Sequence, residues 1–171
     1  MMRQHFRMFA AYNCWANERL YAAAADLDDD DYRLGLGAFF GSVHGTLNHI
    51  LAADRIWMRR FTGEGDAPAR LDAILHDDLA MLTIARETED RRIVDWIDDV
   101  PDAMLEGRFT YTTVTDMRTI SQRLAPALAH FFNHQTHHRG QAHALLTRLG
   151  QVATPLDLLY FQREAAGREF A

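Results

Sequence analysis

Apolar side chains recur at steps of three and four residues along most of this chain, and this spacing constrains the fold more than any other feature. In the first segment the residues that follow it are Phe9, Tyr12, Ala16, Leu20, Ala23 and Leu27. Such spacing places side chains on one face of a helix. The stretch MMRQHFRMFAAYNCWANERL is therefore predicted to be an amphipathic helix, which the run LDDDDYRLGLG interrupts with acids and glycines.

Two further segments show the same helical period. Residues 39–61 carry a broad apolar face, formed by Phe40, Val43, Leu47, Ile50, Leu51, Trp57, Met58 and Phe61. The stretch TGEGDAPA follows and predicts a loop, because Gly63, Gly65 and Pro68 favour turns. A third helix is predicted over residues 69–88, with the inward-facing residues Leu71, Ile74, Leu75, Leu79 and Leu82.

The helical signal weakens between residues 89 and 118. The stretch RFTYTTV (108–114) is rich in aromatic and β-branched residues, which favour a strand. The following TDM (115–117) could turn the chain into a short second strand. The sequence therefore predicts a small hairpin in this region.

The last long helix is predicted to begin at Thr119, because Thr119 and Gln122 match a capping box. Gly150 stands where a C-terminal capping glycine belongs. Pro126 conflicts with this assignment, since a proline beyond the first turn removes one hydrogen bond and kinks the helix. Either the helix bends there or its regular part begins later. A short helix is predicted over residues 156–166.

Several long amphipathic helices with little strand predict an all-α fold. The simplest arrangement is an antiparallel four-helix bundle in a single domain over residues 1–171. A short hairpin before the last long helix and a short C-terminal helix would complete it.

The composition narrows the partners and the location. The net charge of −6 argues against nucleic acid, because phosphate binding needs a basic face. No apolar run approaches the roughly 20 residues that span a bilayer. The first helix contains no apolar signal-peptide core, so we expect no membrane partner. The single cysteine, Cys14, excludes an intramolecular disulfide and fits a reducing compartment, so we expect a cytoplasmic location.

Two histidines occupy the apolar seam of the last long helix. His134 and His138 are four residues apart and share this seam with Phe131 and Leu145, and Gln141 follows on the same face. Buried polar side chains need partners. One partner is a divalent metal, which an H-x-x-x-H pair can bind through two imidazole nitrogens. The alternative is a pair of core histidines that hydrogen-bond to other side chains.

A metal would need a third ligand from another helix, and His49 in GTLNHILAAD is the best candidate. His49 lies at the edge of the apolar arc of its helix, where it could face a neighbouring helix. Together with His134 and His138 it would form a three-histidine site with at least one open position, as catalytic metal sites have. The sequence contains no H-E-x-x-H motif, which argues against a zincin mechanism.

The other polar residues near the seam have weaker claims. His130 and His137 flank it and are expected at the surface or as outer groups that contact the ligands. His137 could replace His138 as a ligand if the helix were rotated. Gln141 is a second candidate for this outer layer. His44 and His143 are expected to face solvent.

Asp54 lies in the middle of an apolar stripe, between Ile50 and Trp57. A buried carboxylate needs a cation or a hydrogen-bond donor. Asp54 could accept the outer N–H of a ligating histidine, which would place it in the outer layer of the metal site. It could equally form an ion pair with Arg139 or Arg55.

Three stretches resemble a known family. NHQTHHRGQ (133–141) is similar to the last-helix signature of the DinB / YfiT-like superfamily, and HGTLNHILAADRIWMRRF (44–61) is similar to its second-helix signature. YNCWANERL (12–20) resembles the first-helix pattern. The two histidine segments are fairly specific in combination. The resemblance covers most of the chain from the first helix to Gly150.

This resemblance implies a DinB-type four-helix bundle, often a homodimer. It also implies a divalent metal, typically zinc or nickel, on His49, His134 and His138. Characterised relatives include thiol S-transferases and a mycothiol-dependent isomerase, which use low-molecular-weight thiols. The family takes its name from a DNA-damage-inducible bacterial gene, which connects it with the stress response.

The expected function is that of a metal-dependent enzyme that acts on a small molecule, either as an S-transferase that uses a low-molecular-weight thiol or as a hydrolase. Tyr12, Asn13, Asn17 and Gln141 could orient the substrate, although first-helix residues serve equally well in packing and capping. Cys14 is expected to be a small buried residue and not a nucleophile. Two alternatives stay open: a metal-stabilised stress or binding protein without turnover, and a plain bundle with hydrogen-bonded core histidines.

Overall fold

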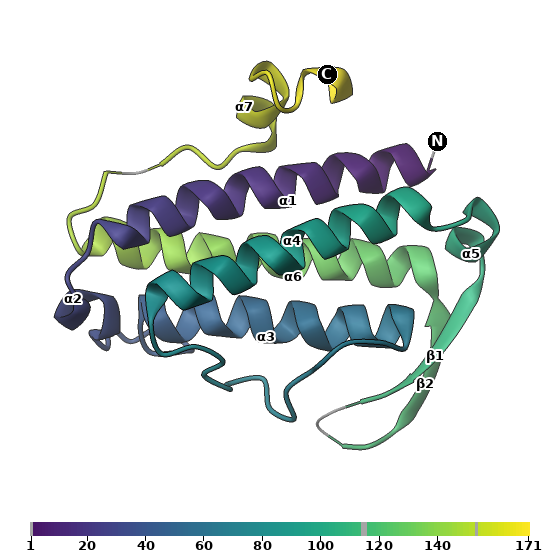
Figure 1. Ribbon diagram of the computed structural model, residues 1–171, viewed down its shortest axis with the longest axis horizontal. Helices are drawn as coiled ribbons and strands as arrows, with labels where there is room; N and C mark the ends of the chain where they lie inside the picture. Colours follow the sequence, from purple (N-terminus) through teal and green to yellow (C-terminus); the bar gives the residue numbers. More distant parts are fainter. Residues whose placement is uncertain (1, 114–115, 153) are drawn as a thin grey trace.

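Four long helices form the body of the computed structural model, which describes residues 2–113, 116–152 and 154–171 (Figure 1). They are α1 (Met2–Ala25), α3 (Val43–Thr62), α4 (Leu79–Asp99) and α6 (Leu124–Arg148). Helix α1 packs against α4 and α6, and α3 packs against the same two helices. The shorter elements are α2 (Asp29–Arg33), α5 (Asp102–Glu106), β1 (Arg108–Thr112), β2 (Thr119–Arg123), α7 (Leu158–Arg163) and the 3₁₀ helix η1 (Arg168–Phe170). The protein is mostly helical, as predicted.

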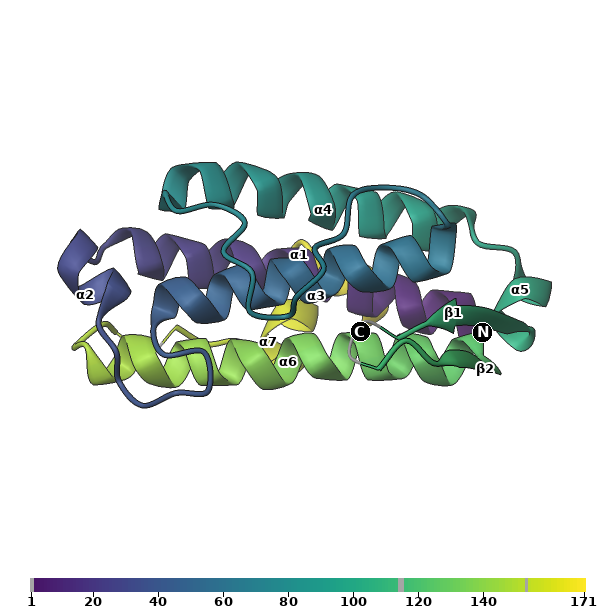
Figure 2. The same ribbon diagram turned by 90° about the horizontal axis from the view of Figure 1, so that it is seen from below.

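The long helices do not all alternate in direction. Helices α3 and α4 run parallel, because Asp77, just before α4, lies 3.7 Å from His44 at the start of α3. Near the other end, Arg92 of α4 donates a hydrogen bond of 3.2 Å to Thr62. The prediction of an antiparallel arrangement is therefore wrong for this pair. The connecting segment, residues 63–78, returns along α3 before α4 begins (Figure 2).

Residues 69–78 form turns and bends in place of the helix that their apolar spacing predicted. The side chain of Asn48 binds them: its Oδ1 accepts hydrogen bonds from the backbone N–H groups of Leu75 (2.8 Å) and His76 (3.0 Å). These bonds replace the ones that a helix would form. Helix α4 begins only after Asp78, whose side chain caps it by accepting a backbone N–H of the first turn at 2.9 Å.

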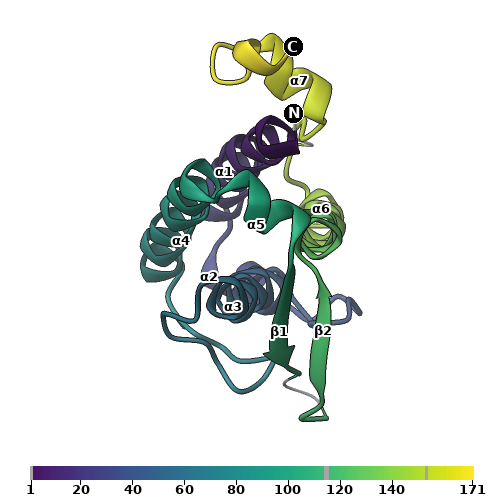
Figure 3. The same ribbon diagram turned by 90° about the vertical axis from the view of Figure 1, so that its right-hand side faces the viewer.

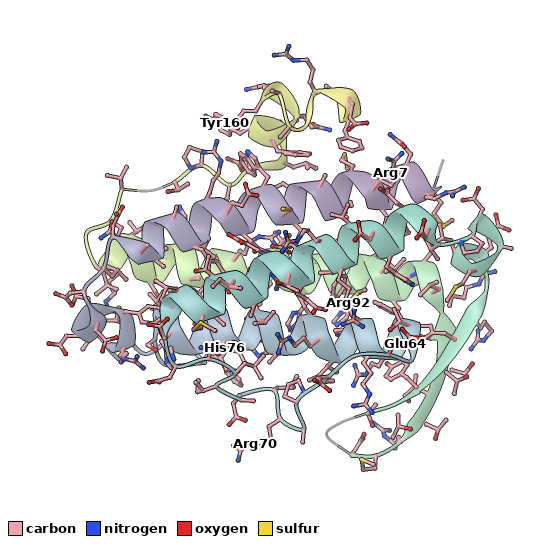
Figure 4. The ribbon with its side chains drawn as sticks, in the orientation of Figure 1. Arg7, Glu64, Arg70, His76, Arg92 and Tyr160 are labelled. Atoms are coloured by element: carbon pink, nitrogen blue, oxygen red, sulfur yellow. The ribbon has the colours of Figure 1, made fainter. Side chains whose placement is uncertain are left out.

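Both ends of this returning segment are fixed to the helices. Arg92 donates a 2.7 Å hydrogen bond to the carbonyl of Glu64, and these two residues lie close together near the end of α3, with His76 toward its start (Figure 4). Leu71 and Ile74 were predicted to face inward but are 40% and 50% exposed. Because the backbone is not helical here, there is no helical face that would bury these two side chains.

Helix α3 begins later than the predicted residue 39. The side chain of Ser42 caps it by accepting a 3.1 Å hydrogen bond from the N–H of Gly45. Residues 38–41 form a tight turn instead, closed by a backbone hydrogen bond of 2.9 Å. Phe39 projects from this turn and is 85% exposed.

The predicted hairpin is present, and its second strand includes residues that were expected to start a helix. Strands β1 and β2 pair antiparallel, with Arg108 opposite Arg123. Thr119 and Gln122 belong to β2 and form no capping box. Helix α6 begins after them, so Pro126 falls in its first turn, where a missing N–H breaks no helical hydrogen bond.

The predicted ends of the last helices are close to those observed. Gly150 follows α6 with a φ of 85°, the left-handed conformation of a C-terminal capping glycine. Helix α7 is shorter than the predicted 156–166. Positions 114–115, which the hairpin prediction includes, lie outside the described residues. Within the described residues, no helix is long and apolar enough to cross a membrane.

The C-terminal segment crosses the outer face of α1, on the side of the molecule away from α3 (Figure 3). Phe161 of α7 is fully buried there against Tyr12 and Trp15. The indole N–H of Trp15 also donates to Glu164 at 2.9 Å. This packing leaves the seam between α3 and α6 uncovered by α7.

Candidate metal centre

Three histidines from two helices come together in the seam between α3 and α6. His49 of α3 and His134 and His138 of α6 each offer one ring nitrogen, and these three atoms all lie within 4.8 Å of one another. The Nε2 atoms of His49 and His138 are 3.2 Å apart. The structure thus brings together the three residues that the sequence predicted as ligands.

The antiparallel register of α3 and α6 explains this grouping. The contact of His49 with His138 is repeated two helical turns away, where the rings of Trp57 and His130 lie 5.2 Å apart. Halfway between these two layers, α3 carries Ala53, which is 2% exposed. Its small side chain leaves room for the third histidine, which occupies the corresponding midpoint of α6.

Hydrogen bonds to the outer ring nitrogens determine which nitrogens face one another. The Nδ1 of His49 donates to the carbonyl oxygen of Leu71 at 2.7 Å, and the Nδ1 of His138 donates to Oε1 of Gln141 at 2.8 Å. A neutral imidazole carries one N–H, so both Nε2 atoms present lone pairs to each other. Lone pairs at this separation repel unless a cation lies between them. Outer N–H groups held by oxygen atoms are typical of metal-ligating histidines, so these residues fit a divalent metal.

Burial keeps the three rings neutral. It lowers the pKa of His49 from 6.5 to about 4, and that of His134 from 6.5 to about 3. The charge that His138 would carry lowers both values further. Burial also lowers the pKa of His138 itself. All three therefore have an unprotonated nitrogen at neutral pH, which is the form that binds a metal.

Phe40 covers one side of the histidine group, a role that its predicted place on an apolar helix face did not indicate. Its ring stacks on that of His49 with a centroid distance of 3.6 Å and meets that of His138 edge-on at 5.5 Å. Gly45 permits this position, because a Cβ atom there would lie 2.0 Å from the carbonyl oxygen of Phe40. The signal in the sequence was the lone glycine in the first turn of α3.

The outer groups are placed only partly as predicted. Gln141 contacts His138 directly, whereas His137 is exposed and its Nε2 lies 3.3 Å from the Nε2 of Gln141. His44 was expected to face solvent but is buried, with its ring 5.2 Å from that of Tyr32. The apolar face of α3 is wider than its sequence suggested, because α2 packs on it.

Asp54 belongs to a separate buried network, contrary to one of its two predicted roles. Its Oδ2 accepts from Arg86 at 2.5 Å and its Oδ1 from Gln135 at 2.8 Å. The predicted partners Arg139 and Arg55 bond to other residues. Five residues separate Asp54 from the histidine of α3, which turns it by about 140° around the helix. It therefore faces the interior between the long helices and not the seam.

The α1 residues proposed to orient a substrate are held by other contacts. Asn13 and Asn17 donate to Oδ1 of Asp90 at 2.9 Å and 3.0 Å. The hydroxyl of Tyr12 donates to the carbonyl of Leu156 at 2.6 Å. These side chains stabilise the packing of α1 and have no contact with the histidine group.

Cys14 also lies outside the histidine group. Burial, with smaller contributions from the carboxylates of Asp90 and Glu18, raises the pKa of its thiol from 9.0 to about 12. Such a thiol stays protonated at neutral pH and is a poor nucleophile. This agrees with the expectation that Cys14 is not catalytic.

The chain is similar to known proteins along nearly its whole length. The model of the DinB family matches residues 1–169. The chain is also similar to Protein DinB of Bacillus subtilis (strain 168), with 24% identity over 161 residues, which cover 85% of this chain and 87% of that protein. Because the family match spans nearly the entire chain and includes all three seam histidines, this protein belongs to the DinB family.

Proposed function

We propose that this protein is a divalent-metal-binding enzyme, built as a DinB-type four-helix bundle in a single domain over residues 1–171. The observation that carries the proposal is the distance of 3.2 Å between the Nε2 atoms of His49 and His138. The Nδ1 atom of each ring already donates a hydrogen bond to an oxygen atom. His134 supplies a third nitrogen. Three protein ligands leave a coordination position open, as in catalytic metal sites.

Zinc and nickel are the metals that we favour, because imidazole nitrogen suits both. A metal bound here would lower the pKa of a bound water toward about 7 or deprotonate a coordinating thiol. The protein's own contribution is orientation: the carbonyl of Leu71 and the side chain of Gln141 fix two of the rings. Phe40 excludes water from one side of His49.

The proposed reaction is a transfer or hydrolysis on a small molecule that uses a low-molecular-weight thiol. Membership of the DinB family and the open coordination position support this class. The alternative is a metal-stabilised stress or binding protein without turnover. Both readings require the metal, so metal binding alone does not separate them.

A conjugation assay separates them. The protein loaded with zinc or nickel would be mixed with a panel of low-molecular-weight thiols and the electrophile monochlorobimane, and fluorescence of the conjugate would be followed. We expect conjugation faster than the uncatalysed rate, and we expect the His134→Ala variant to lose this acceleration. A protein that binds metal tightly but shows no turnover with any thiol or hydrolysable ester would support the alternative.

A further inference from the structure

A groove of about 700 Å³ lies beside α3, about three helical turns from His49. Its walls are the C-terminal half of α3, residues 67–69 of the returning segment, and strand β1 with the residues around it. The hairpin and the returning segment approach each other at this place, on the outer side of α3 (Figures 1 and 3). The volume lies in the range of about 300–1,000 Å³ that is typical of small-molecule sites.

One side chain in the groove is held in a defined orientation. The guanidinium carbon of Arg60 lies 4.6 Å from the ring centroid of Trp57 and 4.6 Å from that of Tyr111. Because these two aromatic rings lie against the guanidinium of Arg60, its edge is the part left for hydrogen bonding. The Nε of Arg60 is buried and has no hydrogen-bond partner among the described residues.

The groove is positively charged in an acidic protein. Its described lining contains two arginines, Arg59 and Arg60, and no carboxylate. Of the two buried arginines, Arg86 forms ion pairs with both Asp54 and Asp90, and Arg139 donates to the amide oxygen of Asn13. Within the described residues neither groove arginine forms an ion pair, although the net charge of the chain is −6. An unpaired guanidinium edge matches the oxygens of a carboxylate or phosphate, which it binds through two parallel hydrogen bonds.

We propose that this groove binds a small organic anion, with its oxyanion group on the edge of Arg60. Arg59 adds a second positive charge at the rim. The apolar part of the ligand lies against Ile56, Pro68 and Tyr111, which line the same groove. An apolar or aromatic body suits these walls best, since Ile56, Pro68 and Tyr111 offer apolar and aromatic surface.

Two sets of contacts connect the groove with the histidine group. Trp57, which contacts Arg60, also contacts His130, whose ring lies 5.9 Å from that of His134. The returning segment lines the groove and, two residues further on, offers the Leu71 carbonyl to the metal centre. None of the three histidines lines the groove, so the anion site can be tested with metal-free protein.

The test measures binding of three related probes by isothermal titration: 1-naphthoate, 1-naphthyl phosphate and the neutral 1-naphthalenemethanol. We expect one or both anions to bind, and to bind more tightly than the alcohol. Preference for either anion supports the proposal and identifies the oxyanion. Arg60→Met is expected to weaken anion binding at least about tenfold, as loss of a charged hydrogen bond does. The same measurement on metal-loaded protein should give the same order of affinities.

Two further variants make the result decisive. Arg59→Met leaves the aromatic contacts of Arg60 intact and should weaken anion binding by a smaller factor, even if Arg60→Met folds poorly. Arg163→Met removes an exposed arginine of α7 and should change nothing. The proposal is overturned if neither anion binds, if the alcohol binds as tightly as the anions, or if Arg163→Met weakens binding as much as the groove variants.

Discussion

At the scale of single residues, the seam histidines are less exposed than the two histidines that flank them on α6, although His134 is only half-buried. His49 and His138 are 2% and 8% exposed, whereas His130 and His137 lie at the surface. The spacing along α6 predicted this division. Phe40 could not be predicted, because its contact with His49 depends on a turn whose shape is not encoded in any periodic pattern.

The low pKa values of the seam histidines predict a particular acid sensitivity of the metal-free protein. The folded-state pKa values, about 4 for His49 and about 3 for His134, lie below the ordinary 6.5, so at mildly acid pH the unfolded chain binds more protons. Their contribution to stability is complete above pH 6.5 and is lost as the pH falls toward 4. We expect the melting temperature to fall over this range, and to fall less in His134→Gln. Equal curves for both proteins would contradict this.

The buried network around Asp54 predicts a large cost for removing its charge. Asp54→Asn leaves Arg86, which is 2% exposed, without one of its two carboxylates. Loss of one partner of a buried ion pair costs about 3–5 kcal/mol, and urea unfolding would measure it. The matched control is Asp98→Asn, which breaks the exposed ion pair with Arg7 and should cost less than about 1 kcal/mol. Similar losses in both variants would show that the network is not important for stability.

At the scale of elements, periodicity predicted the long helices well and their boundaries less well. The error over residues 69–78 has a local cause: Asn48 binds the backbone of this segment, and that contact comes from a different helix. The error at Thr119 arose because a Thr and a Gln three residues apart suit a strand as well as a helix cap. Asp54 was assigned wrong partners because its partner Arg86 lies on α4, whose direction relative to α3 was not predicted.

We expect opposite effects from alanine at two glycines, Gly45 beside the turn that carries Phe40 and Gly140 in α6. Gly45→Ala places a Cβ 2.0 Å from the carbonyl oxygen of Phe40. The turn must therefore move, and the ring of Phe40 must move away from His49. We expect a loss of about 1–3 kcal/mol in urea unfolding and faster removal of bound zinc by a chelator. Gly140→Ala is the control, because no atom lies within 4 Å of its added Cβ, and it should gain about 0.5–1 kcal/mol. Unchanged zinc release in Gly45→Ala would argue against a covering role for Phe40.

At the scale of the whole molecule, the packing of the C-terminal segment and the candidate metal site lie on different sides. The C-terminal segment covers α1, while the histidines lie in the seam between α3 and α6 (Figure 3). The resemblance to the DinB family predicted the three histidine positions, and the helical spacing predicted two of them. The parallel direction of α3 and α4 could not be predicted, because it depends on where residues 63–78 return.

This separation predicts that damage to the C-terminal contact spares metal binding. Phe161 is fully buried, so Phe161→Ala should cost about 3–5 kcal/mol in urea unfolding while the zinc affinity of the folded protein stays the same. Tyr160→Ala next to it is the control, since Tyr160 is 48% exposed and should change stability by no more than about 0.5 kcal/mol (Figure 4). A weaker zinc affinity in folded Phe161→Ala would show that the two sides are coupled.

We expect His49, His134 and His138 to hold one divalent ion together, and metal titration can show whether they do. Chelator-treated protein would be titrated with zinc and nickel, and the purified protein analysed for its elements. We expect one ion per chain and a loss of affinity in His49→Ala and His134→Ala that exceeds the roughly 10–100-fold effect of losing an outer partner. His143→Ala, a change on the same helix outside the histidine group, should leave the affinity unchanged. Absence of stoichiometric binding, or equal affinity in all three variants, would contradict the account.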